Sequence, residues 1–103
     1  LTIVPVPVPE QEAYKEGQRL YACFLSADKR FKDNSIDMGS GFDCFHELSH
    51  PANKKVEPQQ RINRLLLKTL MERHGFVHYD QEWWHFTLKD EPFPNTYFNF
   101  PIN

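Results

Sequence analysis

The clearest hydrophobic pattern lies in the middle of the chain, between Pro58 and Gly75. Proline suits the first turn of a helix, where its missing N–H costs nothing. Glycine just beyond the last patterned residue is a common stop signal. The pattern therefore predicts a helix that begins at Pro58 and ends before Gly75, with its apolar face packed on the core. That face has residues at helical spacing: Ile62, Leu65, Leu66, Thr69, Leu70 and Met71.

Shorter apolar and aromatic runs on both sides of this helix are typical of strands. They are Leu20–Leu25 before the helix, and Phe76–Tyr79 and Trp83–Leu88 after it. A helix followed by short strands predicts an α+β fold, with a small antiparallel sheet and one main helix. We expect the core to form around the residues Trp83, Trp84, Phe86, Leu66, Leu70 and Phe98.

The first residues of the chain follow a different pattern. Proline alternates with Val in the segment up to Pro9, which excludes a central strand because proline donates no ladder hydrogen bond. We therefore divide the chain into a proline-rich arm and polar segment at 1–19 and a domain at 20–103. The three prolines also interrupt the apolar run that a secretory signal needs, so we interpret the start as a processed or truncated end.

Composition excludes several classes of function. The 103 residues include 12 basic and 14 acidic side chains, for a net charge of −2, and no long run has a single sign. A nucleic-acid partner requires clustered Lys and Arg, so none is predicted. No apolar run reaches the roughly 20 residues of a membrane-spanning helix, so no span is predicted. Aromatic residues make up 15% of the chain, which is typical of a packed core and not of disorder.

The two cysteines, Cys23 and Cys44, could form one disulfide. They have no further partners and no Cys-x-x-Cys spacing, so they do not define a disulfide framework or a zinc knuckle. We interpret them as free, partly buried thiols that are not essential to the fold.

Glu82 and His85 are the residue pair most suited to chemistry. A metallopeptidase needs an imidazole to hold zinc and a carboxylate to take a proton from water. Residues three apart share one face of a helix but lie on opposite faces of a strand. The surrounding sequence is strand-like, so Glu82 must lie in the preceding turn if both side chains are to reach one metal. Spacing alone also fits a surface glutamate and a histidine bonded within an aromatic core.

The segments that surround Glu82 and His85 in the sequence indicate a role for this pair. The segments occur in a fixed order: Met38-Gly39-Ser40-Gly41-Phe42-Asp43, Ser49-His50, Arg61-Ile62-Asn63-Arg64-Leu65-Leu66, Glu82-Trp83-Trp84-His85 and Asp90 to Phe98. This set resembles the D-Ala-D-Ala dipeptidases, a family of zinc metallopeptidases that includes enzymes associated with vancomycin resistance. The resemblance covers about residues 36–103 and corresponds to the C-terminal half of the family.

The resemblance implies specific roles. His85 would be a zinc ligand and Glu82 the catalytic base for hydrolysis of D-Ala-D-Ala or of a cell-wall peptide. The fold would correspond to the C-terminal part of the D-Ala-D-Ala peptidase and Hedgehog-like fold. The family's work on cell-wall material implies a bacterial cytoplasm or periplasm.

One family motif has no counterpart. The family supplies its other two zinc ligands from an upstream string of Ser, any residue, His, two residues, Gly, one residue, Ala, one residue and Asp. The nearest frame keeps Gly17 but has Tyr14 at the His position and Tyr21 at the Asp position. Another frame offers Glu16 and Cys23. The remaining residues that could serve as ligands are Asp43, His46, His50 and His78, with His50 interpreted as structural.

The missing motif leaves three hypotheses for the function. The chain could be a part, a divergent form or a processing product of a dipeptidase, with a complementing N-terminal half as a possible partner. It could be a catalytically inactive relative that binds a peptide or a protein. It could also be a structural or interaction domain that kept the aromatic core. Of the three hypotheses, we favour a dipeptidase that is incomplete in this chain.

Overall fold

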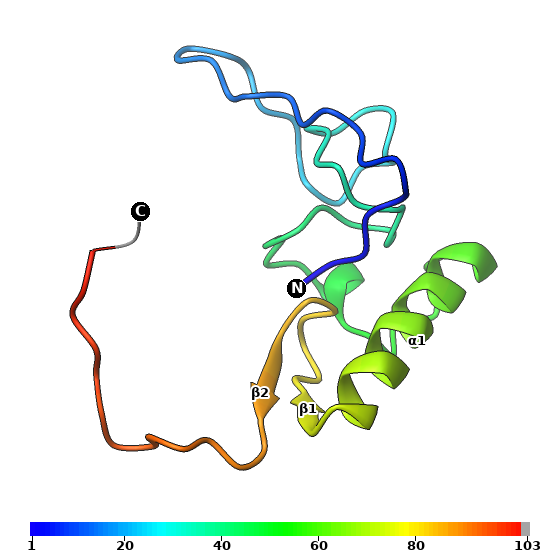
Figure 1. Ribbon diagram of the computed structural model, residues 1–103. Helices are drawn as coiled ribbons and strands as arrows, with labels where there is room; N and C mark the ends of the chain where they lie inside the picture. The colour runs from blue at the N-terminus through cyan, green and yellow to red at the C-terminus, as the bar shows by residue number, and fades with distance from the viewer. Residues whose placement is uncertain (102–103) are drawn as a thin grey trace.

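A computed structural model describes residues 1–101 of the chain. These residues form a 3-10 helix η1 (Glu47–Ser49), a helix α1 (Pro58–Arg73) and two strands, β1 (Phe76–His78) and β2 (Phe86–Leu88). The strands pair antiparallel, with Val77 opposite Thr87. In Figure 1, α1 runs along one side of the molecule and the two strands lie beside the C-terminal end of the helix. The irregular first half of the chain lies above the strands in this view. The fold is α+β, as the sequence predicts.

Both predicted ends of α1 are confirmed. Pro58 is the first helical residue, and the Glu57 N–H before it donates to Gln60 Oε1 at 2.9 Å. This contact satisfies a donor that the helix itself leaves free. Gly75 has φ +84°, a backbone conformation that glycine adopts at no steric cost, and the chain turns there into β1.

The prediction of which face of α1 is buried was wrong. The predicted apolar face is largely exposed, with Leu65 61% and Ile62 58% accessible. The buried face carries Arg64 and Leu67. The reason is that the loop before α1 turns backbone carbonyls toward the helix, and only side chains with donors can satisfy them. The exposed residues that were expected in the core are Ile62, Leu65, Leu66 and Leu70.

The core lies where α1, the preceding loop and the turn before β2 meet. Trp83 and Trp84 are buried there, as expected, and Phe86 packs against them in a half-buried position. Phe98 is 59% exposed and was wrongly assigned to the core. The segment after β2 extends away from the body in Figure 1, and the Phe98 ring lies edge-on to Phe93, with the ring centroids 5.3 Å apart. The remaining members of the buried cluster are Met38, Cys44 and Leu67.

The strand predictions were partly correct. The strand at Phe76–Tyr79 is confirmed as β1 (Phe76–His78), whereas Trp83–Leu88 shortens to β2 (Phe86–Leu88). Trp83 and Trp84 lie instead in the turn before β2 and are buried in the core. Leu20–Leu25 is not a strand: the Leu25 N–H donates to the Ala22 carbonyl at 3.1 Å, which closes a turn.

The interpretation of the cysteines as free thiols was also wrong. Cys23 and Cys44 form a disulfide, with their Cα atoms 5.6 Å apart. The Gly41 N–H donates to the Cys23 carbonyl at 2.8 Å, which brings the early segment alongside the loop that carries Cys44. Such pairing depends on contacts between distant segments, so spacing of the cysteines could not reveal it.

The start of the chain contacts the core. The Leu1 amino group donates to the Trp84 carbonyl at 2.8 Å, and the Ile36 N–H donates to the Ile3 carbonyl at 2.9 Å. The boundary between residues 19 and 20 stays a prediction. Within the part of the chain that the structure describes, no helix is long and apolar enough to cross a membrane.

Candidate active site

Glu82 and His85 lie together in the turn that leads into β2. Their side chains meet with His85 Nδ1 3.1 Å from Glu82 Oε2, and the His85 N–H donates to the Glu82 carbonyl at 3.3 Å. The turn therefore brings the two side chains together, as the sequence required. A carboxylate can only accept a hydrogen bond, so in the neutral imidazole His85 Nδ1 would carry the proton and Nε2 would keep its lone pair. The imidazole is about half exposed, so this lone pair is accessible.

Backbone hydrogen bonds hold the turn that carries the pair to two neighbouring segments. The Trp83 N–H donates to the Ser49 carbonyl at 3.1 Å, which fastens the turn to the loop before α1. On the other side, the Tyr79 N–H donates to the His85 carbonyl at 3.0 Å, at the end of β1. The sequence between Glu82 and His85 thus supplies both the functional groups and the apolar anchors that fix them.

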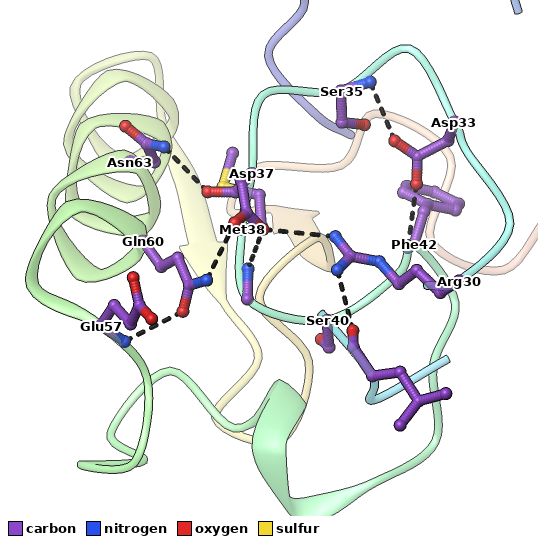
Figure 2. Close-up of polar contacts among 12 residues, drawn as sticks. Arg30, Asp33, Ser35, Asp37, Met38, Ser40, Phe42, Glu57, Gln60 and Asn63 are labelled. Carbon is purple, nitrogen blue, oxygen red and sulfur yellow. Dashed lines mark hydrogen bonds and ion pairs between the residues drawn. The ribbon is translucent and has the colours of Figure 1, made fainter. Parts of the chain in front are cut away.

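Asp37 ties the loop before α1 to the helix. Figure 2 shows its carboxylate between α1 and Arg30: it accepts from Gln60 Nε2 at 2.9 Å, from the Gly39 N–H at 2.9 Å and from Arg30 Nη2 at 3.3 Å. Burial on its own would raise the pKa of Asp37, but these hydrogen bonds outweigh burial and hold the pKa below its usual value. The backbone carbonyl of Asp37 also accepts from Asn63 Nδ2 at 2.8 Å. The carboxylate is therefore charged at neutral pH and fixes the entrance to the loop.

A small cavity of about 220 Å³ opens beside Glu82. His46 lines this cavity and makes two contacts of its own. Its Nδ1 accepts from the Leu48 N–H at 3.1 Å, and its ring stacks on Phe24 with the ring centroids 4.3 Å apart. His46 therefore caps η1 in this arrangement. The complete lining of the cavity is Phe45, His46, Glu47, His50, Gln81 and Glu82.

The described residues do not by themselves form a zinc site. A catalytic zinc takes three protein ligands, and residues 1–101 contain no group of three His, Cys, Asp or Glu side chains placed to hold a metal. Cys23 is in the disulfide. His78 lies under the turn, with Nε2 3.3 Å from the Trp83 carbonyl, and burial lowers its pKa. The other residues considered as ligands, which are Glu16, Asp43, His46 and His50, do not form such a group with His85.

Sequence reasoning missed the residues that support the pair. Arg64 lies outside the predicted apolar face of the helix, yet it is only 3% exposed. Ser40 and Ser49 are also buried, and neither serine had a predicted role of its own. The two glycines around Ser40 were a weak signal. Gly39 has φ +89°, and a Cβ added there would lie 2.9 Å from Gln60 Oε1 and 3.0 Å from Val56 Cγ1.

Comparison with known proteins gives this geometry a context. A family model described as D-ala-D-ala dipeptidase matches residues 7–103 of the chain. The chain belongs to the D-Ala-D-Ala dipeptidase family. The family resemblance drawn from the Glu-Trp-Trp-His segment is confirmed.

Individual members of the family match a shorter stretch. A D-alanyl-D-alanine dipeptidase of Enterococcus faecium is 46% identical over 67 residues, which are 65% of this chain and 33% of that protein. One from Streptomyces coelicolor is 46% identical over 65 residues, 63% of this chain and 32% of that protein. One from Escherichia coli is 51% identical over 55 residues, 53% and 28% respectively. The chain spans about a third of the length of the curated relatives it matches.

Proposed function

We propose that this chain contributes His85 and Glu82 to the active site of a zinc-dependent D-Ala-D-Ala dipeptidase. His85 is the proposed zinc ligand and Glu82 the proposed catalytic base. The observation that carries the proposal is the contact between His85 Nδ1 and Glu82 Oε2 at 3.1 Å, in a chain that the dipeptidase family model matches over residues 7–103. The substrate class is a D-Ala-D-Ala dipeptide or a related cell-wall peptide.

The hydrogen bond between the two side chains suits both roles. A carboxylate that accepts from one imidazole nitrogen fixes the ring and raises the basicity of the other nitrogen, as in many metal sites. Glu82 uses Oε2 for this contact, and no hydrogen bond involves its Oε1 among the described residues. Glu82 can therefore orient His85 through one oxygen and accept a proton from water through the other.

The proposed site needs donors from another polypeptide segment. His85 is one ligand, and a catalytic zinc takes three from protein. We propose that a complementing N-terminal half of the family supplies the other two. Two observations support this: the relatives are about three times as long as the stretch they share with this chain, and α1 exposes a contiguous apolar face, which is typical of an interaction surface. That face consists of Ile62, Leu65, Leu66 and Leu70.

The same proposal assigns the fold and the compartment. The helix and two-stranded sheet would be the C-terminal part of the D-Ala-D-Ala peptidase and Hedgehog-like fold. The matched relatives come from bacteria. Of the two bacterial compartments considered, the disulfide favours the periplasm, because disulfides persist in oxidising environments.

The test is hydrolysis of D-Ala-D-Ala by the chain co-expressed with the upstream two thirds of the Enterococcus faecium dipeptidase. We expect negligible release of D-alanine by either polypeptide alone and turnover by the two together. Glu82→Gln should lower turnover by about 100-fold or more, the usual contribution of a general base. His74→Ala is the matched control for His85→Ala, because His74 is an exposed histidine at the end of α1.

Two results would count against the proposal. Turnover that survives His85→Ala would show that the pair has no part in the site. Peptide binding without turnover in every combination would favour the alternative of an inactive relative that binds peptides or proteins.

A further inference from the structure

We propose that Arg64 and Ser40 are positioning residues that set the geometry of the Glu82–His85 pair through Trp83. The inference rests on the proposed function only in treating Glu82 and His85 as the working pair. Neither Arg64 nor Ser40 contacts Glu82 or His85 directly. Their effect passes through a chain of contacts from α1 to the turn before β2.

The first step is a hydrogen-bond relay with a fixed direction. Ser49 Oγ donates to the Cys44 carbonyl at 2.6 Å, which uses its only hydrogen. In the 2.7 Å contact between the two serines, Ser40 Oγ must therefore donate to Ser49 Oγ. Ser40 Oγ in turn accepts from the Trp83 indole Nε1 at 3.0 Å. An indole N–H can only donate, so each hydroxyl has one role and the relay cannot reverse.

The second step is the clamp that holds the two serines together. Arg64 donates through Nε to the Met38 carbonyl at 2.6 Å, through Nη2 to Leu48 at 2.8 Å and through Nη1 to His50 at 3.1 Å. Met38 lies two residues before Ser40, and the other two acceptors flank Ser49. The guanidinium is a rigid planar fork, so one side chain fixes the spacing between the two halves of the loop.

Arg64 keeps its charge in this position. Burial lowers its pKa to about 10, partly opposed by the charge of Asp37. The guanidinium therefore remains protonated at neutral pH, and its hydrogen bonds to the three carbonyls are charge-assisted.

Trp83 connects the two serines to the Glu82–His85 pair. Trp83 is held at two points, by Ser40 Oγ at its indole and by the Ser49 carbonyl at its backbone N–H. Trp83 directly follows Glu82 and is 1% exposed, so it cannot turn without moving that neighbour. The position of the Glu82 carboxylate relative to His85 Nδ1 thus depends on the two serines, and the serines depend on Arg64.

The test reads the His85 ring by ¹⁵N NMR in the full chain, without metal or substrate, at a pH where the imidazole is neutral. In the wild type, we expect the proton on Nδ1, which faces Glu82. Ser40→Ala removes the acceptor of the indole. It should convert the His85 signal to a mixture of tautomers and shift the Trp83 indole N–H resonance. The matched control is Ser35→Ala, which removes a 2.8 Å hydroxyl contact with Thr2 that is not part of the relay.

This readout separates positioning from simple stability. A residue that only stabilises the fold would lower the unfolding midpoint and leave the His85 tautomer unchanged in the folded protein. That result for Ser40→Ala would overturn the proposal. If Ser40→Ala does not fold, Ser40→Cys replaces the strong acceptor with a weak one at similar size, and the same two outcomes apply. Because dipeptidase activity is not measured, the outcome is independent of whether the proposed function holds.

Discussion

Reduction of the Cys23–Cys44 disulfide should remove much of the stability of this chain. The two residues are 21 positions apart. Closing a loop of that length lowers the entropy of the unfolded chain enough to contribute about 3 kcal/mol to folding at room temperature. The stability of most domains is only about 5–15 kcal/mol, and a chain this small has a limited core. Losing the bond should therefore bring the protein close to unfolding.

The assay is urea unfolding followed by tryptophan fluorescence, with and without a phosphine reductant. Trp83 and Trp84 are both buried and report on the core directly. We expect the midpoint to fall with reductant in the wild type. The double variant Cys23→Ala, Cys44→Ala should show the same midpoint under both conditions. Two results together would contradict a stabilising disulfide: equal urea midpoints for the wild type with and without reductant, and two titratable thiols in the untreated protein.

Three further predictions follow from the packing. Arg64→Leu removes the donor of three backbone carbonyls and should cost about 3 kcal/mol or more, because each unsatisfied buried polar group costs about 1–3 kcal/mol. Arg61→Leu on the exposed side of α1 should cost less than about 1 kcal/mol, and equal costs in urea unfolding would contradict this. Trp84→Ala should cost about 3–5 kcal/mol and Leu66→Ala far less, so an unchanged melting temperature for Trp84→Ala would contradict the core assignment. Burial lowers the pKa of His78, so the unfolded chain binds its proton first as pH falls. The contribution of neutral His78 to stability should be fully present above about pH 6.5 and should be lost as the pH falls toward the pKa of His78 in the folded protein. In thermal melts, His78→Gln should flatten that decline.

The helix could be predicted from sequence because its limits are local. Pro58 and Gly75 act on the residues next to them, and both ends of α1 were correct. The buried face could not be predicted, because it depends on the carbonyls of Met38, Leu48 and His50 in a loop with no regular pattern. Apolar spacing therefore predicted the helix but assigned the wrong face to the core, and the buried face carries Arg64 and Leu67.

The candidate site divides in the same way. Glu82 and His85 are three residues apart, so the turn between them could be inferred from the need to bring both to one point. The relay through Ser40 and Ser49 joins residues far apart in sequence to Trp83, and neither serine carries a recognisable motif. The disulfide was missed for the same reason, since it depends on a turn near Cys23 that looked like a strand.

We propose that Glu82 and His85 form one part of a dipeptidase zinc site whose other ligands lie on another segment. Elemental analysis of the purified 103-residue chain tests it most directly. A single imidazole holds zinc far less tightly than three or four converging ligands, so we predict that the isolated chain is purified nearly free of zinc. One tightly held zinc per chain, lost in His85→Ala and kept in His74→Ala, would contradict the account and show that residues of this chain complete the site.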